Sequence, residues 1–367
     1  ITELDVRIPL PGVEFPRAPH EQYWVFFDIS QIVWDGGASR EQKLYEQKTT
    51  EAAAKQVETE MQQLRERINN LYFLILSLKE NEHLYELSRQ TLVSRLTGME
   101  AAVKAGAAMV VQKNQIQAEI LRTEQLLEDV RKDRKAVLDI LGILTGMSFS
   151  DSTVLKVPVF HAEVFSDTLT RPEMEVFDLQ IAANQQLERA LRTRNYPRIV
   201  AFAQAGYGNP PGMNLLRNEW DFYWSAGVGL KWNLWDWNTL KHDIRMTSIQ
   251  GEKLAVRKET FVTNVRTQLA QERTNILKFR EAVLRSEEIV RLHHQILSSM
   301  ASGLENGIIT ATDYLAEHNT LLQAEISRSI NRLQLLRATL AYFTIQGNVE
   351  TKVSAWEIPV WETISMQ

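Results

Sequence analysis

The sequence predicts a mostly helical fold of mixed α and β class, built from long antiparallel helical hairpins joined to short amphipathic strands. Residues 38–147 and 239–347 contain no proline and no tryptophan and are rich in Ala, Leu, Glu, Gln, Lys and Arg, as long helices are. All 10 prolines and all 9 tryptophans of the 367-residue chain lie outside these two windows, which favours strands and turns there.

The two helical windows are copies of each other. Four sequence features recur at a constant distance of 201 residues: Trp34-Asp35 as Trp235-Asp236, Gly106 as Gly307, Gly146 as Gly347, and Leu155–Phe160 as Trp356–Trp361. A fifth, Tyr23-Trp24, recurs as Tyr223-Trp224 one residue out of step, which a bulge or turn could absorb. The chain is therefore predicted to be a duplication of one strand, helix, turn, helix unit.

The duplication divides the chain into two predicted structural repeats, 1–160 and 161–367. In the first repeat we expect strands over 1–9 and 22–35 and a helical hairpin over 38–146. In the second we expect a helix over 171–194, strands over 198–208 and 221–235, a hairpin over 239–347 and a C-terminal segment over 348–367. The first repeat lacks the counterpart of helix 171–194 and most of that of strand 198–208, so we expect at least about 30 further residues before Ile1.

Each hairpin reverses at glycines, near Gly98–Gly106 and Gly303–Gly307, and its arms carry apolar residues at alternating spacings of four and three. This heptad spacing predicts coiled-coil packing between neighbouring helices. The predicted seam residues are Val57, Met61, Leu64, Ile68, Leu71, Ile75 and Leu78 in the first arm, Val262, Val265, Leu269, Ile276, Phe279 and Val283 in its copy, and Ile116, Ile120, Leu127, Val130, Val137, Leu141 and Leu144 in the first return arm.

The strands are amphipathic with a period of two. In 223–235 one face consists of Trp224, Ala226, Val228, Leu230, Trp232 and Leu234, and the other is small or polar. Residues 199–208 would supply an antiparallel partner. Such a strand fits a half-buried position in a soluble sandwich, and it equally fits the wall of an outer-membrane barrel, where aromatic girdles border an outward apolar band.

Composition and motifs exclude several classes of function. The net charge of −5 argues against a nucleic-acid partner, and the absence of cysteine excludes disulfide scaffolds, zinc ribbons and thiol catalysis. The longest apolar run, Leu71–Leu78, is far shorter than the roughly 18–20 residues of a membrane-spanning helix. The adjacent His293 and His294 point to different faces of a helix and do not form a metal site. No phosphate-binding loop and no pair of nucleophile and base is present, so we expect neither an enzyme nor a cofactor or metal site.

The chain resembles the TolC family of outer-membrane efflux channels. The resemblance rests on Tyr23-Trp24, on Gln31–Gly37, on the counterparts Tyr223-Trp224 and Trp235-Asp236, on Asn195–Arg198 before a strand, and on Gly307–Leu315, which fits the family's Gly-x5-Asp-x-Leu pattern. It implies a duplicated subunit with four strands and two helical hairpins. Three such subunits would close a twelve-stranded transmembrane β-barrel above a helical tunnel (an α-barrel), with 348–367 at its equator.

The resemblance also implies a function, a location and partners. It implies a passive conduit for export, part of a tripartite efflux or type I secretion system, in the outer membrane of a Gram-negative bacterium and extending into the periplasm. A homotrimer, a periplasmic adaptor protein, an inner-membrane pump of RND or ABC type and outer-membrane lipid are the implied partners. The expected lipid-facing residues are Trp224, Val228, Leu230 and Trp232, and the expected adaptor-docking residues of the hairpin tips are Gly106, Gly307, Ile308 and Ile309.

Asp313 is the candidate residue of the channel entrance. With Thr310 it forms a capping-box pattern at a predicted helix start. In the family, the matching position lines the periplasmic entrance, where three carboxylates favour cations. Both roles can hold together. Gln112 is the entrance position of the first copy, where the family often has a second aspartate, and Ile309 stands where some members have an arginine.

Two other classes of protein are compatible with the same patterns. A soluble periplasmic coiled-coil adaptor would have one hairpin and a compact β-domain with its apolar residues turned inward. An envelope scaffold would keep the fold without conducting.

Overall fold

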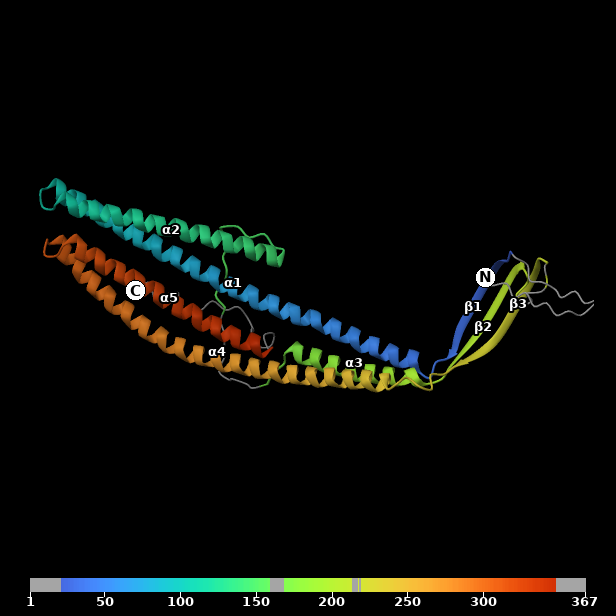
Figure 1. The fold of residues 1–367 in the computed structure, drawn as a ribbon. Coiled ribbons are helices and arrows are strands. Elements are labelled where there is room, and N and C mark those ends of the chain that lie inside the picture. Colours follow the sequence, from blue (N-terminus) through green and yellow to red (C-terminus); the bar gives the residue numbers. More distant parts are fainter. Residues whose placement is uncertain (1–20, 159–167, 213–216, 218, 348–367) are drawn as a thin grey trace, which may run out of the picture. The chain divides into compact units, whose positions relative to one another are not determined.

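The computed structural model describes residues 21–158, 168–212, 217 and 219–347. Its helices and strands are β1 (Tyr23–Trp34), α1 (Ala38–Lys104), α2 (Val110–Thr145), α3 (Pro172–Arg192), β2 (Arg198–Asn209), β3 (Asp221–Lys231), α4 (Thr239–Glu305) and α5 (Ala311–Gln346) (Figure 1). The expected strand over 1–9 and the expected segment over 348–367 lie outside the described residues.

The helices of the two copies have equal lengths. α1 and α4 each have 67 residues, and α2 and α5 each have 36. Each helix of the second hairpin begins and ends 201 residues after its counterpart, the same distance that separates the repeated sequence motifs. A division of the whole chain into repeats 1–160 and 161–367 remains our proposal. By internal contacts the chain forms two compact units, one of 1–52 with 178–255 and one of 53–177 with 256–367.

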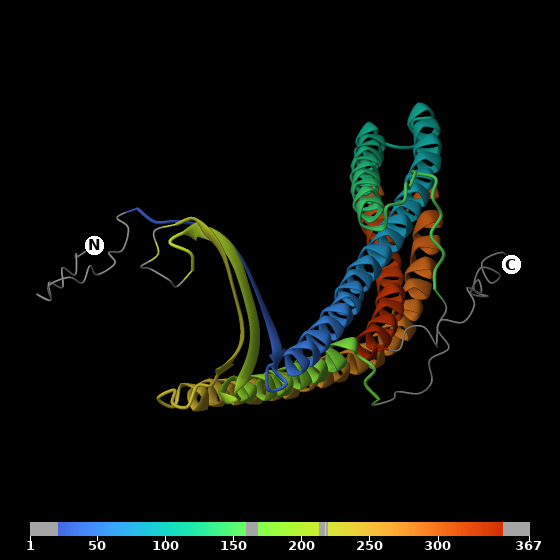
Figure 2. The ribbon, with the colours of Figure 1, turned by 90° about the vertical axis from the view of Figure 1, so that its right-hand side faces the viewer.

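The first unit contains a three-stranded antiparallel sheet in the order β1-β2-β3. Phe27 pairs with Ala205, and Ala205 pairs with Trp224 on its other side. β3 ends at Lys231, four residues before the expected bound, because its last partner, Arg198, is the first residue of β2. Figure 2 shows the three strands side by side in a curved sheet.

The apolar faces of this sheet are not covered by other described residues. Every residue of β1 is exposed, and β3 alternates between exposed and intermediate residues. The structure therefore does not bury the strands as a soluble sandwich would.

The part of α3 in this unit is held to α1 and α4 by amide hydrogen bonds: Asn184 donates to the Thr247 carbonyl at 2.7 Å, and Gln186 donates to the Glu41 carboxylate.

The second unit contains the packed parts of both hairpins. Four of the seven seam residues predicted for α2 are buried, Ile116, Ile120, Leu127 and Leu141, whereas Val130, Val137 and Leu144 are only partly buried. In α4, Val265, Leu269 and Ile276 are buried as expected. The seam predicted for these two helices is therefore confirmed at seven of its residues and partly buried at the others, and Figure 1 shows α1 beside α2 and α4 beside α5.

The seam predicted for the start of the first arm is wrong. Ile75 is buried, but Val57 and Met61 are more than half exposed, at 58% and 59%. Gln62 is buried instead, and its side-chain amide donates to the Thr344 carbonyl of α5 at 2.7 Å. α1 thus turns a polar face toward α5 in this region, where Gln62 adds a donor to the Thr344 carbonyl that also accepts from the Gly347 N–H at 3.1 Å.

Candidate functional site

Both hairpin tips use the same turn. Gly106 and Gly307 have φ of 74° and 68°, the left-handed region that a glycine enters without steric cost. The next residue in each tip closes a hydrogen bond back into the preceding helix: Ala107 N–H donates to the Ala102 carbonyl and Ile308 N–H to the Gly303 carbonyl, both at 2.8 Å. This is the Schellman arrangement that ends a helix at a glycine, and it explains why both tips need Gly at this position.

The start of α5 is fixed by Thr310 and Asp313. Asp313 N–H donates to the Thr310 hydroxyl at 3.2 Å, and Thr310 N–H donates to the Asp313 carboxylate at 3.3 Å. The Thr310 hydroxyl also donates to the same carboxylate at 2.7 Å. The capping box expected from the sequence is confirmed. Asp313 is nevertheless exposed, so the carboxylate is also accessible to solvent at the tip.

The start of α2 repeats this geometry without a charge. Met109 N–H donates to the Gln112 side-chain oxygen at 3.2 Å, as Thr310 N–H does to Asp313. Met109 has no hydroxyl to return the hydrogen bond. The first tip therefore presents a neutral amide at the position where the second tip presents a carboxylate.

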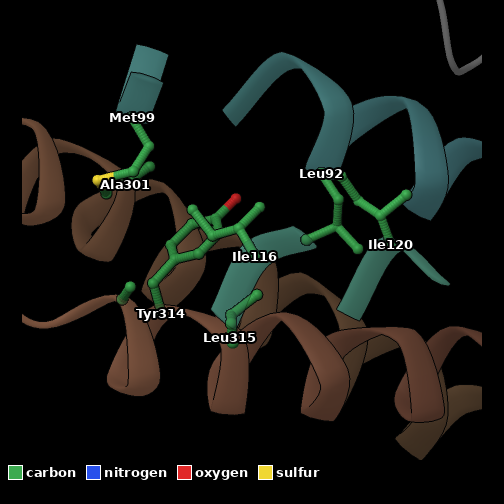
Figure 3. Packing of buried hydrophobic residues seen from close by; sticks show 8 residues of the cluster. Leu92, Met99, Ile116, Ile120, Ala301, Tyr314 and Leu315 are labelled. Carbon is green, nitrogen blue, oxygen red and sulfur yellow. The ribbon is translucent and has the colours of Figure 1, made fainter. Parts of the chain in front are cut away.

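A buried cluster beneath the tips joins the two hairpins (Figure 3). We call it the tip cluster; it consists of Leu92 and Met99 of α1, Ile116 and Ile120 of α2, Ala301 of α4, and Ala311, Tyr314 and Leu315 of α5. Tyr314 is only 1% exposed, and the Arg95 guanidinium lies over its ring, 5.6 Å from the ring centroid. Arg95 also pairs with Glu305, and Gln115 donates to the Thr312 hydroxyl at 3.0 Å, so polar contacts connect the hairpins around this cluster.

The four residues expected to dock an adaptor differ in accessibility. Gly106 and Gly307 are exposed and Ile308 is 78% exposed, whereas Ile309 packs against the tip cluster. Sequence reasoning missed three exposed apolar side chains of the first tip, Met109, Val110 and Val111. The signal for them was the unbroken apolar run immediately after the glycine turn.

The sheet presents the four residues expected to face lipid. Trp224, Val228, Leu230 and Trp232 are 55% to 73% exposed. Aromatic residues also gather at both ends of the strands. At one end Tyr23 and Tyr207 stack on Trp220, with centroids 6.2 and 5.7 Å away, and at the other Trp232 donates to the Asn195 carbonyl at 3.0 Å.

Two other kinds of feature, a membrane-spanning helix and a metal-binding cluster, are absent from the described residues. No helix there carries an apolar stretch of the length needed to cross a bilayer. No group of three or more His, Asp or Glu side chains there is arranged to hold a metal ion. His293 and His294 instead contact different carboxylates of α5, those of Glu317 at 2.7 Å and Glu325 at 3.0 Å.

Paired 67- and 36-residue helices joined to a sheet with an exposed apolar face also make up the fold of several solved outer-membrane proteins. VceC of Vibrio cholerae has this fold with a TM-score of 0.70 at 14% identity, covering 89% of this chain and 86% of its own. The CmeC outer membrane channel of Campylobacter jejuni gives 0.71 at 12% identity, covering 90% and 78%, and the Neisseria gonorrhoeae MtrE outer membrane channel gives 0.66 at 14%, covering 91% and 82%. None of the curated proteins matches the sequence significantly.

Residues 168–348 match the family described as outer membrane efflux protein, so the chain contains a domain of that family. The resemblance to the TolC family and the mostly helical TolC-like fold are thereby confirmed.

Proposed function

We propose that this chain is one subunit of a homotrimeric channel that serves as a passive conduit for export through the outer membrane. The observation that carries the proposal is the exposed apolar face of β3, which is bordered by aromatic residues and lies in the same chain as two equal helical hairpins. An apolar face of this kind, alternating with Ser225, Gly227, Gly229 and Lys231, fits a strand with lipid on one side and a polar lumen on the other.

The edges of the sheet support assembly. Within the described residues β1 and β3 each have one neighbour, β2, and so each leaves a row of backbone N–H and C=O groups unpaired. In a bilayer such groups require partners, which only a closed barrel provides to strands. Three copies with four strands each, as in the TolC family, would close a twelve-stranded barrel.

The hairpin tips would form the periplasmic entrance and the contact with other proteins. Asp313 is exposed at the tip, and three copies around an axis would form a carboxylate ring that attracts cations, with the neutral Gln112 alternating around it. The exposed Gly106, Gly307 and Ile308, with the partly covered Ile309, would dock a periplasmic adaptor.

An inner-membrane pump of RND or ABC type would supply the energy of a tripartite efflux or type I secretion system, so the channel itself needs neither a cofactor nor an enzymatic activity.

The test is ion conduction by the purified protein in planar lipid bilayers. We expect cation-selective channels, and we expect Asp313→Asn to lower the ratio of cation to anion permeability about twofold or more, because it removes three charges from one constriction. Glu100→Gln is the control, since Glu100 is an exposed carboxylate of α1 that takes part in no helix cap. An inserted trimer without conductance would make the chain an envelope scaffold, and unchanged selectivity in Asp313→Asn would leave Asp313 only its capping role.

A further inference from the structure

The two faces of the three-stranded sheet differ in charge. Residues paired across the strands share a face, and so does every second residue along a strand. By this rule the face that carries Ser225 also carries all the charged residues of the three strands: Asp28, Arg198, Asp221 and Lys231. The opposite face, with Trp224 and Val228, has none within these strands. We call the charged face the inner face, since it would line the lumen of the proposed channel.

Three aromatic rings of the inner face lie over glycines of the neighbouring strand. Each ring belongs to the residue paired directly with the glycine: Trp24 with Gly208, Tyr223 with Gly206 and Phe202 with Gly227. A Cβ built on any of these glycines would lie within 2.8 Å of an atom of the facing ring, closer than unbonded atoms approach. The rings therefore lean across the sheet into space that a side chain would otherwise fill, and the glycines are required to leave that space open.

These rings are held in place without being covered. Trp24 Nε1–H donates to the Pro210 carbonyl at 2.7 Å, which fixes the orientation of the indole. Trp24 and Phe202 are nevertheless 41% and 46% exposed, and Phe26, in the same row as one of the covered glycines, is 53% exposed. A ring that is already fixed loses little conformational freedom when a ligand binds to it. We call Trp24, Phe26, Phe202 and Tyr223 the inner aromatic residues.

A carboxylate lies among the inner aromatic residues. Asp28 is exposed and belongs to the inner face of β1. The adjoining row of paired residues on one side contains Phe26 and Tyr223, and the adjoining row on the other side contains Phe202. Asp28 therefore places one negative charge between two rows of aromatic rings.

The other charges of the inner face are paired or distant. The Asp221 carboxylate lies 3.1 Å from the Arg217 guanidinium. Arg198 and Lys231 are paired with each other at the opposite end of the strands, six residues from the row of Asp28, which corresponds to about 20 Å. Asp28 is therefore the charge that a solute in contact with the rings would meet.

We propose that the inner aromatic residues, with Asp28 as the counter-charge, form a weak binding surface for planar aromatic cations. Planar rings stack on aromatic side chains, and the π face of an aromatic ring attracts a positive charge, so a solute with both properties fits this surface best. The surface depends on the proposed channel function, which places the inner face in the lumen, and it adds the chemical class of a solute that the wall favours. Weak binding suits a conduit, since a solute has to leave as readily as it enters.

Ethidium, a planar aromatic cation, serves as the probe. The purified protein is placed in phosphatidylcholine nanodiscs, and binding is followed by the fluorescence of the dye, with empty nanodiscs as the background. We expect saturable binding. N-methylquinolinium, an aromatic cation, should displace the dye at concentrations about fivefold or more below those needed of tetrapropylammonium, which has the same charge and no ring.

Adjacent phenylalanines of β1 provide a matched pair of variants. We expect Phe26→Leu and Asp28→Asn each to weaken ethidium binding about three- to tenfold, because one removes a π face and the other removes the opposing charge. Phe27→Leu is the control, since Phe27 is 67% exposed on the opposite face of the same strand, and it should change the affinity less than about twofold. Equal melting temperatures of the three variants would show that the sheet is intact.

Binding and conduction are measured separately, so the binding surface and the channel can fail independently. A conducting protein that binds no ethidium would refute the surface and leave the rings only the role of covering glycines, although the channel would stand. Equal losses in Phe26→Leu and Phe27→Leu would show that the dye is held elsewhere, which also refutes the surface. Unchanged affinity in Asp28→Asn would overturn the assignment to cations. The expected pattern of binding in a protein that does not conduct would support the surface and refute the conduit.

Discussion

The buried histidine His318 links two helices in a way that no local sequence pattern indicates. His318 is only 5% exposed, and its Nε2 lies 2.8 Å from the Ser88 hydroxyl, which joins α5 to α1. Its Nδ1 is buried and has no hydrogen-bond partner among the described residues. Burial lowers the pKa of His318, and the Glu119 carboxylate opposes this shift without reversing it. The sequence offered no sign of this, because Ser88 is 230 positions away.

His318 should make the protein less stable in mild acid. Its pKa is lower in the folded chain than in the unfolded one, so below about pH 6.5 the unfolded chain takes up the proton more readily. Stability is therefore complete above that pH and is lost as the pH falls toward the folded-state pKa. We expect thermal unfolding at pH 7.5 and 5.5 to show a smaller acid destabilisation for His318→Gln than for the unmodified protein. His83→Gln, at an exposed position of α1, is the control, and an equal acid effect in all three proteins would contradict the account.

Replacing Trp237 by glycine should stabilise the protein, whereas replacing a tryptophan by glycine ordinarily destabilises it. Trp237→Gly removes a left-handed bulky residue, and we expect the free energy of unfolding in detergent to rise by up to about 1 kcal/mol, since relief of strain exceeds the entropy cost of glycine. Trp235→Gly, which relieves no such strain, should lower it or leave it unchanged. Denaturant titration of the two variants decides the question, and a loss of stability in Trp237→Gly would show that the conformation is not strained.

The helices show which features of the fold sequence periodicity predicts and which it does not. Absence of proline, glycine turns and the 201-residue repeat located both hairpins, because helix bounds depend on local properties. The heptad in α2 identified Ile116, Ile120, Leu127 and Leu141 of the buried face but missed Leu138. It failed in α1 at Val57 and Met61, since a heptad shows which face is apolar but not which neighbour lies opposite. Gln62 is buried there by a long-range bond to α5 that no local pattern reveals.

The tip cluster should carry much of the stability that holds the two hairpins together. Ile116 of α2 is fully buried in it, so we expect Ile116→Ala to cost roughly 2–5 kcal/mol through lost apolar contact and the cavity left behind. Val111→Ala, an equally apolar truncation at an exposed position of the same helix, should cost less than about 0.5 kcal/mol. Hydrogen exchange at the tip amides of α4 and α5 should accelerate only in the first variant; protection unchanged there would mean that the hairpins are stabilised independently.

At the scale of the whole molecule, the sheet is the part that a single chain leaves incomplete. Its apolar residues are exposed and its outer edges are unpaired within the described residues, although the alternating pattern in β3 appears as the sequence predicted. The pattern alone could not choose between a soluble sandwich and a membrane wall, because both need one apolar face per strand. The structure favours the membrane wall, since no described layer covers that face.

Electron microscopy of the protein purified in detergent tests the central claim most directly. The proposed channel predicts particles with threefold symmetry and a long axis well over about 100 Å, because a 67-residue helix alone spans roughly that length. The same particles should carry a belt of bound detergent around the apolar band of the barrel. Compact monomers that stay in solution without detergent would contradict the channel, and the exposed strands would then have to be covered by some other partner.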